Sequence, residues 1–373
     1  MSPAGLYIHI PFCHQKCKYC NFYSIVPPND LSPFIKALLH ELSLYNREFG
    51  CFDTVYIGGG TPSVLSARSI ADILTAVRTE YRILPEAEIT IEVNPGDTGV
   101  DYLTAFRRSG VNRLNIGIQS FDDRLLRFLG RRHNRQQAVD AIGNAFAAGF
   151  DNIGLDLIYG IPGQTFGGWQ ETLARATSFR PHHLSCYQLT LEADTPLGRQ
   201  YRENLLELPG ETEQAEFFFR TAAFLENTGY IHYEVSNFAR SASLLSRHNQ
   251  KYWQHQPYLG IGPSAHSFSR GKRWWNHRSI GRYMDALLNG GAPVEDSEIL
   301  TAEQMRMEAL FLGFRTSRGI DLCDFEEKYR YDLLDGKSDA LQRLADAGLI
   351  EISNRSIRPT RAGLAVADHL ALI

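Results

Sequence analysis

Short apolar runs rich in β-branched residues alternate with helix-period stretches through the first half of the chain, and this alternation limits the possible folds most strongly. Each run is bounded by Gly, Pro, Asn or a polar turn, which is typical of βα units around a parallel sheet. The predicted strands are residues 6–11, 54–57, 88–93, 113–118, 152–158 and 183–189. The predicted helices are residues 32–49, 66–81, 101–109, 136–148 and 168–179, with Ser66 and Asp101 as N-caps of two of them.

Six strands are fewer than a closed barrel of eight requires, so the pattern predicts an α/β fold with an open, partial (β/α)6 barrel over residues 1–193. In parallel α/β folds, ligands bind where the carboxyl ends of the strands meet the loops that follow. We therefore expect the site at that edge of the sheet.

The alternation weakens after residue 193. A helix is predicted at residues 212–227, an extended run at 230–235 and an aromatic-rich stretch at 252–275. We interpret residues 194–295 as an α+β extension of the barrel. From residue 296 to 373 the pattern of short helices and a compact ending predicts a small winged-helix-like domain that covers the barrel or contacts a protein partner.

Composition indicates a globular protein. The chain has 373 residues, of which 43% are hydrophobic, and this is enough to bury a large core. The formal net charge is −4 and no dense run of Lys and Arg occurs, so nucleic acid is not an expected partner. The first residues lack the positive start of a signal peptide, and no run approaches the roughly 20 apolar residues of a membrane span. We expect a cytoplasmic protein.

Three of the six cysteines, Cys13, Cys17 and Cys20, lie close together directly after the first predicted strand. This is metal usage and not a disulfide framework. Three thiolates on one loop can bind three corners of an iron–sulfur cube and leave the fourth iron open to S-adenosylmethionine (SAM). A zinc site or three incidental thiols are the alternatives, but structural zinc prefers four ligands and no second pair with that spacing follows.

The segment from Tyr7 to Cys13 together with the C-x3-C-x2-C spacing resembles the radical SAM superfamily, in particular its oxygen-independent coproporphyrinogen III oxidase-like branch. The resemblance extends over about residues 5–275. It implies a [4Fe-4S] cluster on the three cysteines and a bound SAM. It also implies that Gly59, Gly60 and Thr61 contact the SAM amino group, although a glycine triplet alone is more often a tight turn.

Polar residues near successive strand ends match further SAM-contacting positions of that family. Carboxylates can accept from ribose hydroxyls or an ammonium group, and Arg131, expected in a helical segment, can pair with the methionine carboxylate. Taken singly, each is more often an ordinary rim or surface residue, a buried tyrosine is usually core, and His266 fits a proton donor or a packing role equally well. The implied SAM contacts are Tyr7, Tyr19, Gly59, Gly60, Thr61, Glu92, Gln119, Arg131, Asp156, Thr190 and His266.

Within this branch, the coproporphyrinogen III dehydrogenases have a fourth cysteine and a longer N-terminal arm. Here Phe22 occupies the fourth-cysteine position, and only twelve residues precede Cys13. The chain instead resembles the heme chaperone relatives, because the segment from His248 to Trp253 matches their H-N-x-x-Y-W motif. The resemblance thus implies a heme carrier and does not favour coproporphyrinogen dehydrogenase activity.

Imidazole is a good axial ligand for heme iron, so His248 is the predicted heme ligand. A lone histidine beside aromatic residues is more often structural, and this alternative stays open. The resemblance implies a heme-accepting protein, such as a membrane-associated cytochrome or oxidase, and an electron donor for the cluster. The alternative function is an oxygen-independent coproporphyrinogen III dehydrogenase or a related radical SAM enzyme that acts on a tetrapyrrole.

Overall fold

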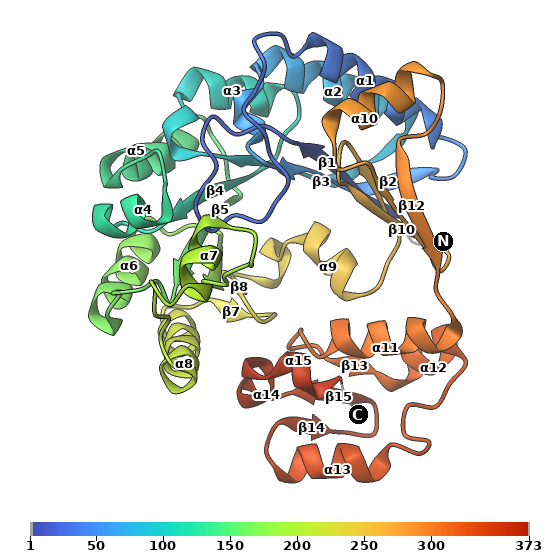
Figure 1. Cartoon of the computed structure of the whole chain (residues 1–373). Helices are drawn as coiled ribbons and strands as arrows, with labels where there is room; N and C mark the ends of the chain where they lie inside the picture. Colours follow the sequence, from blue (N-terminus) through green and yellow to red (C-terminus); the bar gives the residue numbers. More distant parts are fainter. Residues whose placement is uncertain (1–2, 372–373) are drawn as a thin grey trace.

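The computed structural model describes residues 3–371. Its parallel core confirms the six predicted strands, which pair in chain order as expected for a partial barrel. They are β1 (Ala4–Ile10), β2 (Cys51–Gly59), β3 (Arg82–Val93), β4 (Arg113–Gln119), β5 (Ile153–Tyr159) and β6 (His183–Gln188). Figure 1 shows the helices of the first half on the outer face of this curved sheet. They are α1 (Ser32–Leu44), α2 (Ala67–Glu80), α3 (Val100–Arg108), α4 (Asp123–Leu129), α5 (Arg135–Ala147) and α6 (Phe166–Ser178).

The helices form because their apolar residues recur at helical spacing and pack on the sheet. In α2, for example, Ile70, Ile73, Leu74 and Val77 are all buried. Ser66 is the N-cap of this helix, as predicted, and accepts a hydrogen bond from the backbone amide of Ser69.

The prediction that Asp101 is an N-cap is wrong. The N-cap of α3 lies two residues earlier than expected, at Gly99, and Asp101 is in the first turn of the helix. An acidic residue in the first turn still interacts favourably with the positive end of the helix dipole, which explains why the two positions are hard to distinguish from the sequence.

The part of the chain expected as an extension adds strands to both edges of the same sheet. Beyond β6 lie β8 (Asn237–Ala239) and β7 (Ile231–His232), so only two residues of the extended run 230–235 are in a strand. Next to β1 lies β9 (Tyr258–Ile261), which is parallel to it, followed by the antiparallel β10 (His266–Ser269), β11 (Lys272–Asn276) and β12 (Val294–Ile299).

Helices of this part are α7 (Pro196–Arg202), α8 (Glu211–Asn227), α9 (Arg247–Trp253) and α10 (Ile280–Leu288). Short 3-10 helices lie at Pro62–Val64, Pro95–Asp97 and Ala242–Leu244. In Figure 1 the helix α9 lies between the two edges of the sheet, and it contacts β1, β2 and the first C-terminal helix. It is therefore one of the elements that connect the barrel with the C-terminal part, together with α8, which contacts the C-terminal residues Arg361–Ala365.

The C-terminal residues have a hydrophobic core of their own, which includes Leu310, Phe314, Phe325, Leu341 and Ile357. Helices surround a three-stranded antiparallel sheet, as in a winged-helix arrangement. The elements are α11 (Ala302–Gly313), β13 (Ile320–Asp321), α12 (Leu322–Tyr329), α13 (Ser338–Asp346), β14 (Ile350–Ile352), β15 (Ser356–Pro359), α14 (Arg361–Ala365) and α15 (Ala367–Leu370). This part lies beneath α9 in Figure 1 and is joined to the barrel through β12.

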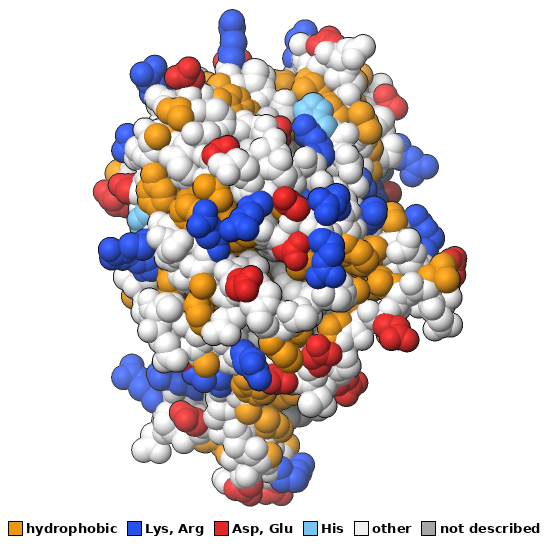
Figure 2. Space-filling view, turned by 90° about the vertical axis from the view of Figure 1, so that its left-hand side faces the viewer, with side chains coloured by type: hydrophobic (Ala, Val, Ile, Leu, Met, Phe, Trp, Pro, Cys, Tyr) orange, Lys and Arg blue, Asp and Glu red, His pale blue; other side chains and the backbone are white. Residues whose placement is uncertain are grey.

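The surface carries charges of both signs. On the face drawn in Figure 2, Lys and Arg side chains are interspersed with Asp and Glu and with small apolar areas. Within residues 3–371, none of the helices combines the length and the apolar character needed to cross a membrane.

Candidate cofactor site

The three clustered cysteines lie on the loop that leaves the carboxyl end of β1. Backbone hydrogen bonds between Cys13 and Ile25 (3.0 Å) and between Ile25 and Pro11 (2.8 Å) close this loop at its base. The amide of Lys18 donates to the carbonyl of Leu129 (3.0 Å), which fixes the middle of the loop against α4. The sequence prediction that this loop follows a strand end is confirmed, and all three thiols are partly exposed.

Polar groups from other strand ends approach two of the sulfur atoms. The hydroxyl of Thr61 lies 3.4 Å from Cys13 Sγ, and the guanidinium of Arg131 donates to Cys17 Sγ at 3.3 Å. The pKa of the Cys20 thiol is raised, chiefly by burial. Iron binds the thiolate, so cluster binding would release the proton of the Cys20 thiol.

Among residues 3–371 no three His, Cys, Asp or Glu side chains are placed to hold a metal ion. A four-iron cluster does not require three side chains around one metal ion, because each thiolate binds a separate iron. Three cysteines on one closed loop, with a hydroxyl and a guanidinium beside the sulfurs, fit such a cluster.

The end of β2 packs directly against the cysteine loop, and the glycines there are required by close approach. A Cβ atom at Gly60 would lie 2.7 Å from the carbonyl oxygen of Phe12. Gly59 has a φ of +114°, and a Cβ atom there would lie 2.7 Å from His9 Nδ1. The two glycines therefore let the end of β2 pack closely against β1 and the start of the cysteine loop, and their amides bond Glu92 and the carbonyl of Ile10.

Glu92, near the end of β3, lies inside the barrel with its carboxylate turned toward β2. It accepts hydrogen bonds from the Tyr56 hydroxyl (2.7 Å) and from the amide of Gly59 (3.3 Å). Burial raises the pKa of Glu92 to about 7. This carboxyl group therefore changes between a donor and an acceptor near neutral pH.

Asp156 on β5 also lies inside the barrel and is half-buried. Its Oδ2 accepts from Asn115 Nδ2 at 2.6 Å, whereas its Oδ1 has no hydrogen-bond partner within the protein. Burial raises the pKa of this carboxyl group as well. An unpartnered buried acceptor is costly unless a ligand satisfies it, so this atom fits a donor such as a ribose hydroxyl.

The sequence predicted that Arg131 lies in a helix. In the structure it lies just past the end of α4. Besides Cys17, it donates to Asn94 Oδ1 (2.5 Å) and to the carbonyl of Gly117 (2.7 Å), and its Nε has no partner. The helix ends at Gly130, whose φ of +76° is the left-handed conformation of a common helix C-cap. One guanidinium thus connects the cysteine loop with the ends of β3 and β4.

The remaining predicted SAM residues lie at the same edge of the sheet but farther from one another. Gln119 ends β4 with a φ of +64°. Tyr19 is half-buried, and loss of solvent around its hydroxyl raises the pKa of that group. Thr190 is exposed after β6. His266 is exposed and stacks on Trp275, and the antiparallel direction of β10 places it at the cysteine-bearing edge.

Tyr7 differs from these residues, because its hydroxyl bonds to His9 Nδ1 at 3.0 Å inside the barrel. Three further residues were not singled out from the sequence: Tyr56, Asn94 and Asn115 each bond a predicted SAM residue. Asn94 directly follows β3, so the strand-end pattern contained a signal for it.

His248 lies at the other end of the barrel. Its Nδ1 is 2.9 Å from the hydroxyl of Thr54, near the start of β2, and its Nε2 is 2.9 Å from the hydroxyl of Tyr252. The side chain is 1% exposed, and burial lowers its pKa to about 3. The ring also stacks on Tyr56.

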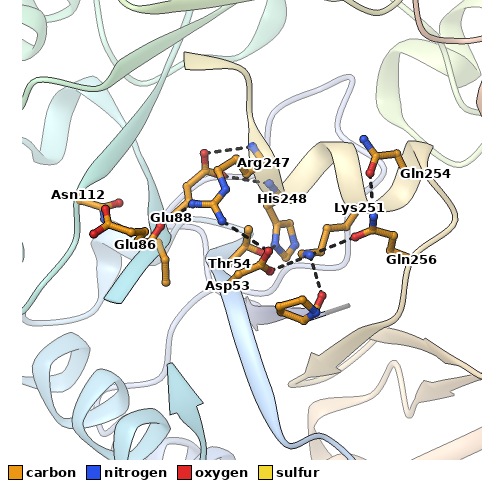
Figure 3. Close-up of polar contacts among 12 residues, drawn as sticks. Asp53, Thr54, Glu86, Glu88, Asn112, Arg247, His248, Lys251, Gln254 and Gln256 are labelled. Carbon is orange, nitrogen blue, oxygen red and sulfur yellow. Dashed lines mark hydrogen bonds and ion pairs between the residues drawn. The ribbon is translucent and has the colours of Figure 1, made fainter. Parts of the chain in front are cut away.

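Figure 3 shows how this region is fixed. The carboxylate of Glu88 accepts from the backbone amides of Arg247 and His248 (both 3.1 Å) and so satisfies the first turn of α9. The buried Lys251 donates to the carbonyl of Pro3 and forms an ion pair with Asp53 at 2.7 Å. This is the geometry of the hydrogen-bonded structural histidine that the sequence left open as an alternative.

The cysteine loop and His248 lie at opposite ends of the strands, although two tyrosines lie between them: the rings of Tyr7 and Tyr56 contact the His248 ring, and the Tyr56 hydroxyl bonds Glu92. Gly5 of β1 is a neighbour of His248, and Ile10 begins the cysteine loop; five residues of strand span about 17 Å. The structure therefore does not bring His248 to the cysteine-bearing edge.

A partial parallel barrel with a C-x3-C-x2-C loop at its carboxyl edge, glycines at the end of β2 and buried carboxylates on β3 and β5 defines a radical SAM protein. The model of the Radical SAM superfamily matches residues 7–176, and that of the HemN C-terminal domain matches residues 300–366. The superfamily implies SAM and a [4Fe-4S] cluster, and the residues described above fit both.

Comparison with curated relatives identifies the branch of the superfamily to which the chain belongs. "Heme chaperone HemW" of Lactococcus lactis is 33% identical over 99% of this chain and 96% of its own length, and that of Bacillus subtilis is 33% identical over 98% and 97%. The mitochondrial "Radical S-adenosyl methionine domain-containing protein 1" of Bos taurus is 34% identical over 99% and 86%. The chain belongs to the oxygen-independent coproporphyrinogen III oxidase-like family, in the HemW branch.

A solved structure supports the fold. Coproporphyrinogen III oxidase (HemN) from Escherichia coli has a TM-score of 0.86 over 99% of this chain and 89% of that chain. At 24% sequence identity this likeness concerns the fold alone.

Proposed function

We propose that this protein is a heme chaperone: it binds heme together with a SAM-ligated [4Fe-4S] cluster and passes the heme to an acceptor protein. The observation that carries the proposal is the match, over almost the whole chain, to relatives described as heme chaperones. Phe22 supports it, because this side chain stands where the porphyrinogen dehydrogenases have a fourth cysteine and is 67% exposed beside the cysteine loop.

The cluster and SAM would be held at the cysteine-bearing edge. Cys13, Cys17 and Cys20 would bind three irons, and the cluster would supply an electron to SAM. Arg131 is suited to the methionine carboxylate, since its Nε is unpartnered. Asp156 Oδ1 is suited to a ribose hydroxyl for the same reason.

The other predicted contacts complete this proposal. Gly59, Gly60 and Thr61 would present backbone and hydroxyl groups to the SAM amino group, and Glu92 is placed to accept from an ammonium. Tyr7, Tyr19, Gln119, Thr190 and His266 would line or support the same space. An electron donor for the cluster and a heme-accepting cytochrome or oxidase at a membrane would be the partners, and the protein would act in the cytoplasm.

His248 is a candidate heme ligand by its motif. Both ring nitrogens are engaged and the side chain is buried, so iron binding by His248 would require α9 to move out of the barrel. This movement would also break the ion pair of Lys251 with Asp53.

An anaerobic heme titration of cluster-reconstituted protein, followed at the Soret band, tests the proposed function. We expect saturable binding, followed by loss of the heme to an apo-cytochrome on mixing. In parallel, His248→Ala tests the ligand, and the exposed His369→Ala is the matched control. Absence of saturable binding by the wild-type protein would refute the chaperone function.

The second candidate function is a radical enzyme acting on a tetrapyrrole. It is favoured by the concentration of buried polar groups at the cysteine-bearing edge, which a simple carrier would not need. Reductive SAM cleavage that depends on added coproporphyrinogen, with a decarboxylated product, would establish this function instead.

A further inference from the structure

The cysteine loop presents its outer side to solvent. Between the cysteines, the side chains of His14, Gln15, Lys16 and Lys18 are all exposed, and the three thiols are themselves partly exposed. A cluster bound to these thiols would therefore lie near the surface of the protein, where a partner can approach it.

The cysteine loop and α4 form one continuous surface. Besides the backbone bond of Lys18 to Leu129, the side chain of Gln15 donates to the carbonyl of Gly130 at 3.1 Å. The stem of Lys18 lies over the same glycine, because a Cβ atom at Gly130 would lie 3.0 Å from Lys18 Cγ. Charges on the outer side of α4 consequently lie next to those of the loop.

This surface carries exposed cations. Lys16, Lys18 and Arg127 are exposed, and in the part of the chain from residue 3 to residue 371 none of the three forms an ion pair with a carboxylate. The side chain of Arg124 is 64% exposed and approaches the carboxylate of Asp122 only to 3.9 Å. Four positive charges are thus available to a partner on the loop and α4.

The two carboxylates of α4 and its N-cap are bonded to backbone amides. Asp122 caps the helix and accepts from the amides of Arg124 and Leu125. Asp123 accepts from the amide of Arg135 at 2.6 Å. These two negative charges are held at the start of the helix, whereas Arg127 lies in its last turn, nearer to the cysteine loop.

The positive charge is local. On the other side of the loop, α7 and its flanking residues carry both signs: Glu192, Asp194, Arg199, Arg202 and Glu203. The whole chain has a formal net charge of −4. An acidic partner is therefore repelled by the molecule as a whole and attracted by the loop and α4, which orients its approach toward the cysteines.

Apolar side chains lie beside the same cysteines. Phe22 is 67% exposed and Val26 is 71% exposed, and the backbone amide of Phe22 donates to the sulfur of Cys20. Docking faces of proteins commonly combine an aromatic centre with a charged rim. Phe22 and the surrounding cations have this arrangement.

The chemistry of the site requires an external electron. A cluster that gives an electron to SAM must be reduced again, and the carrier must dock near the cluster. Complexes of electron-transfer proteins bury little surface, less than about 1,200 Å², and rely on complementary charges for fast association. An anionic membrane would also attract the cations, but it would not explain why they surround the cysteine loop.

We infer that the surface formed by the cysteine loop and α4 binds an acidic electron-carrier protein, with Lys16, Lys18 and Arg127 facing its carboxylates and Phe22 at the centre of the contact. One electron passes from the reduced carrier to the cluster, which changes from the 2+ to the 1+ state. The carrier leaves oxidised by one electron. The inference rests on the proposed function and names the partner of its cluster site.

The test uses the full-length, cluster-reconstituted protein in anaerobic stopped flow. Flavodoxin hydroquinone serves as the acidic carrier, and its oxidation by one electron is followed by the appearance of the neutral semiquinone. The radical cation of methyl viologen serves as a small reductant that needs no docking surface. The variants are Arg127→Glu, the double variant Lys18→Glu/Arg127→Glu, and Phe22→Ser.

The matched control is Arg343→Glu. Arg343 is exposed and lies in the last turn of α13 in the C-terminal part, as Arg127 lies in the last turn of α4. It makes the same charge change at the same helical position. The cluster absorbance and the circular dichroism spectrum report whether each variant is loaded and folded.

We expect Arg127→Glu to slow cluster reduction by flavodoxin about tenfold at low salt, and the double variant to slow it further. Because salt screens exposed charges, the wild-type rate should fall as the ionic strength rises, and the variants should show a flatter dependence. Phe22→Ser should slow the reaction at every salt concentration. Reduction by methyl viologen should not be slower in any variant, and Arg343→Glu should behave as the wild type does.

Equal flavodoxin rates in the wild type and Arg127→Glu, or an equal loss in Arg343→Glu, would overturn the inference. Binding of the wild type to phosphatidylserine vesicles that Arg127→Glu abolishes, with an unchanged flavodoxin rate, would assign the surface to a membrane instead. If the double variant does not retain the cluster, Arg127→Glu, which lies outside the loop, decides the question.

The same measurements distinguish this inference from the proposed function. If methyl viologen reduces the wild-type cluster and flavodoxin does not, the inference fails while the cluster site stands. If the reconstituted wild-type protein holds no cluster, the proposed cofactor site and this inference fail together.

Discussion

The two edges of the barrel use similar residue types for different purposes. At the carboxyl-terminal edge, Arg131 and Asp156 each keep one buried polar atom without a partner, so this edge retains capacity to bind a ligand. At the amino-terminal edge, both nitrogens of His248 and the ammonium of Lys251 are bonded to protein groups. The contrast concerns these particular residues, because Arg113 Nε and Gln250 Nε2 at the amino-terminal edge also lack a hydrogen-bond partner. A buried polar residue has capacity for a ligand only when some of its hydrogen bonds remain unmade.

The helix α9 explains the contrast. It places His248 and Tyr252 toward the barrel interior, whereas Trp253 lines a cavity between the barrel and the C-terminal part. The H-N-x-x-Y-W motif is thus divided between two environments that the linear sequence does not distinguish.

The largest effect that sharpens this comparison is expected at the cysteine loop. Each of Cys13→Ala, Cys17→Ala and Cys20→Ala should abolish the cluster absorbance, because three ligands are already the minimum in this motif. The control Cys323→Ser, at an exposed position in the C-terminal part, should retain it. Iron and sulfide analysis with electron paramagnetic resonance measures the outcome, and a full four-iron signal in any of the three variants would contradict the assignment.

The second effect is opposite pH dependence at the two edges. The pKa of His248 is lowered to about 3, so the unfolded state binds a proton below about pH 6.5 that the folded state does not bind; this costs stability as the pH falls. The pKa of Glu92 is raised to about 7, so stability is lost as the pH rises from about 4.5 through 7. Each proton contributes up to about 1.4 kcal/mol per pH unit within its window.

We expect His248→Gln to flatten the acid side of the stability profile and Glu92→Gln to flatten the side toward pH 7. Anaerobic urea unfolding at half-unit pH steps measures both slopes. Other buried histidines contribute to the acid side, so His248→Gln removes only one share of that slope, and the exposed His369→Gln should change neither. Identical slopes in the wild type and Glu92→Gln would show that this carboxyl group does not titrate as its burial implies.

The smallest effect is expected from Arg131→Lys. Lysine keeps the charge but cannot make the bidentate pair with a carboxylate, so SAM binding should weaken about tenfold, or ~1.4 kcal/mol. Calorimetry with cluster-loaded protein measures this affinity. The neighbouring Arg132→Lys, whose side chain is partly exposed and pairs with Asp97 at 3.8 Å, is the matched control. Equal losses in the two variants would show that the effect is not specific to the guanidinium of Arg131.

Much of the barrel could be predicted from the sequence, because strand and helix periodicity are local properties. The six strands and the Ser66 cap follow from such patterns. The position of Arg131 was predicted less well: it follows the C-cap Gly130 and is not in a helix, and a single glycine decides that difference. The sequence also gave no indication that residues 194–299 supply strands to both edges of one sheet, since pairing depends on partners far along the chain.

The sequence by itself determined the cysteine loop and the strand-end polar residues, and hence the class of protein. The three cysteines lie within one short loop, and the carboxyl ends of parallel strands meet at one edge of any βα fold. Only the tertiary structure decided the environment of α9. The backbone amide and both ring nitrogens of His248, near the start of this helix, are hydrogen-bonded to Glu88, Thr54 and Tyr252. The last residues of the helix line a cavity that the C-terminal part completes. These contacts join segments that are far apart in the sequence, and local periodicity contains no information about them.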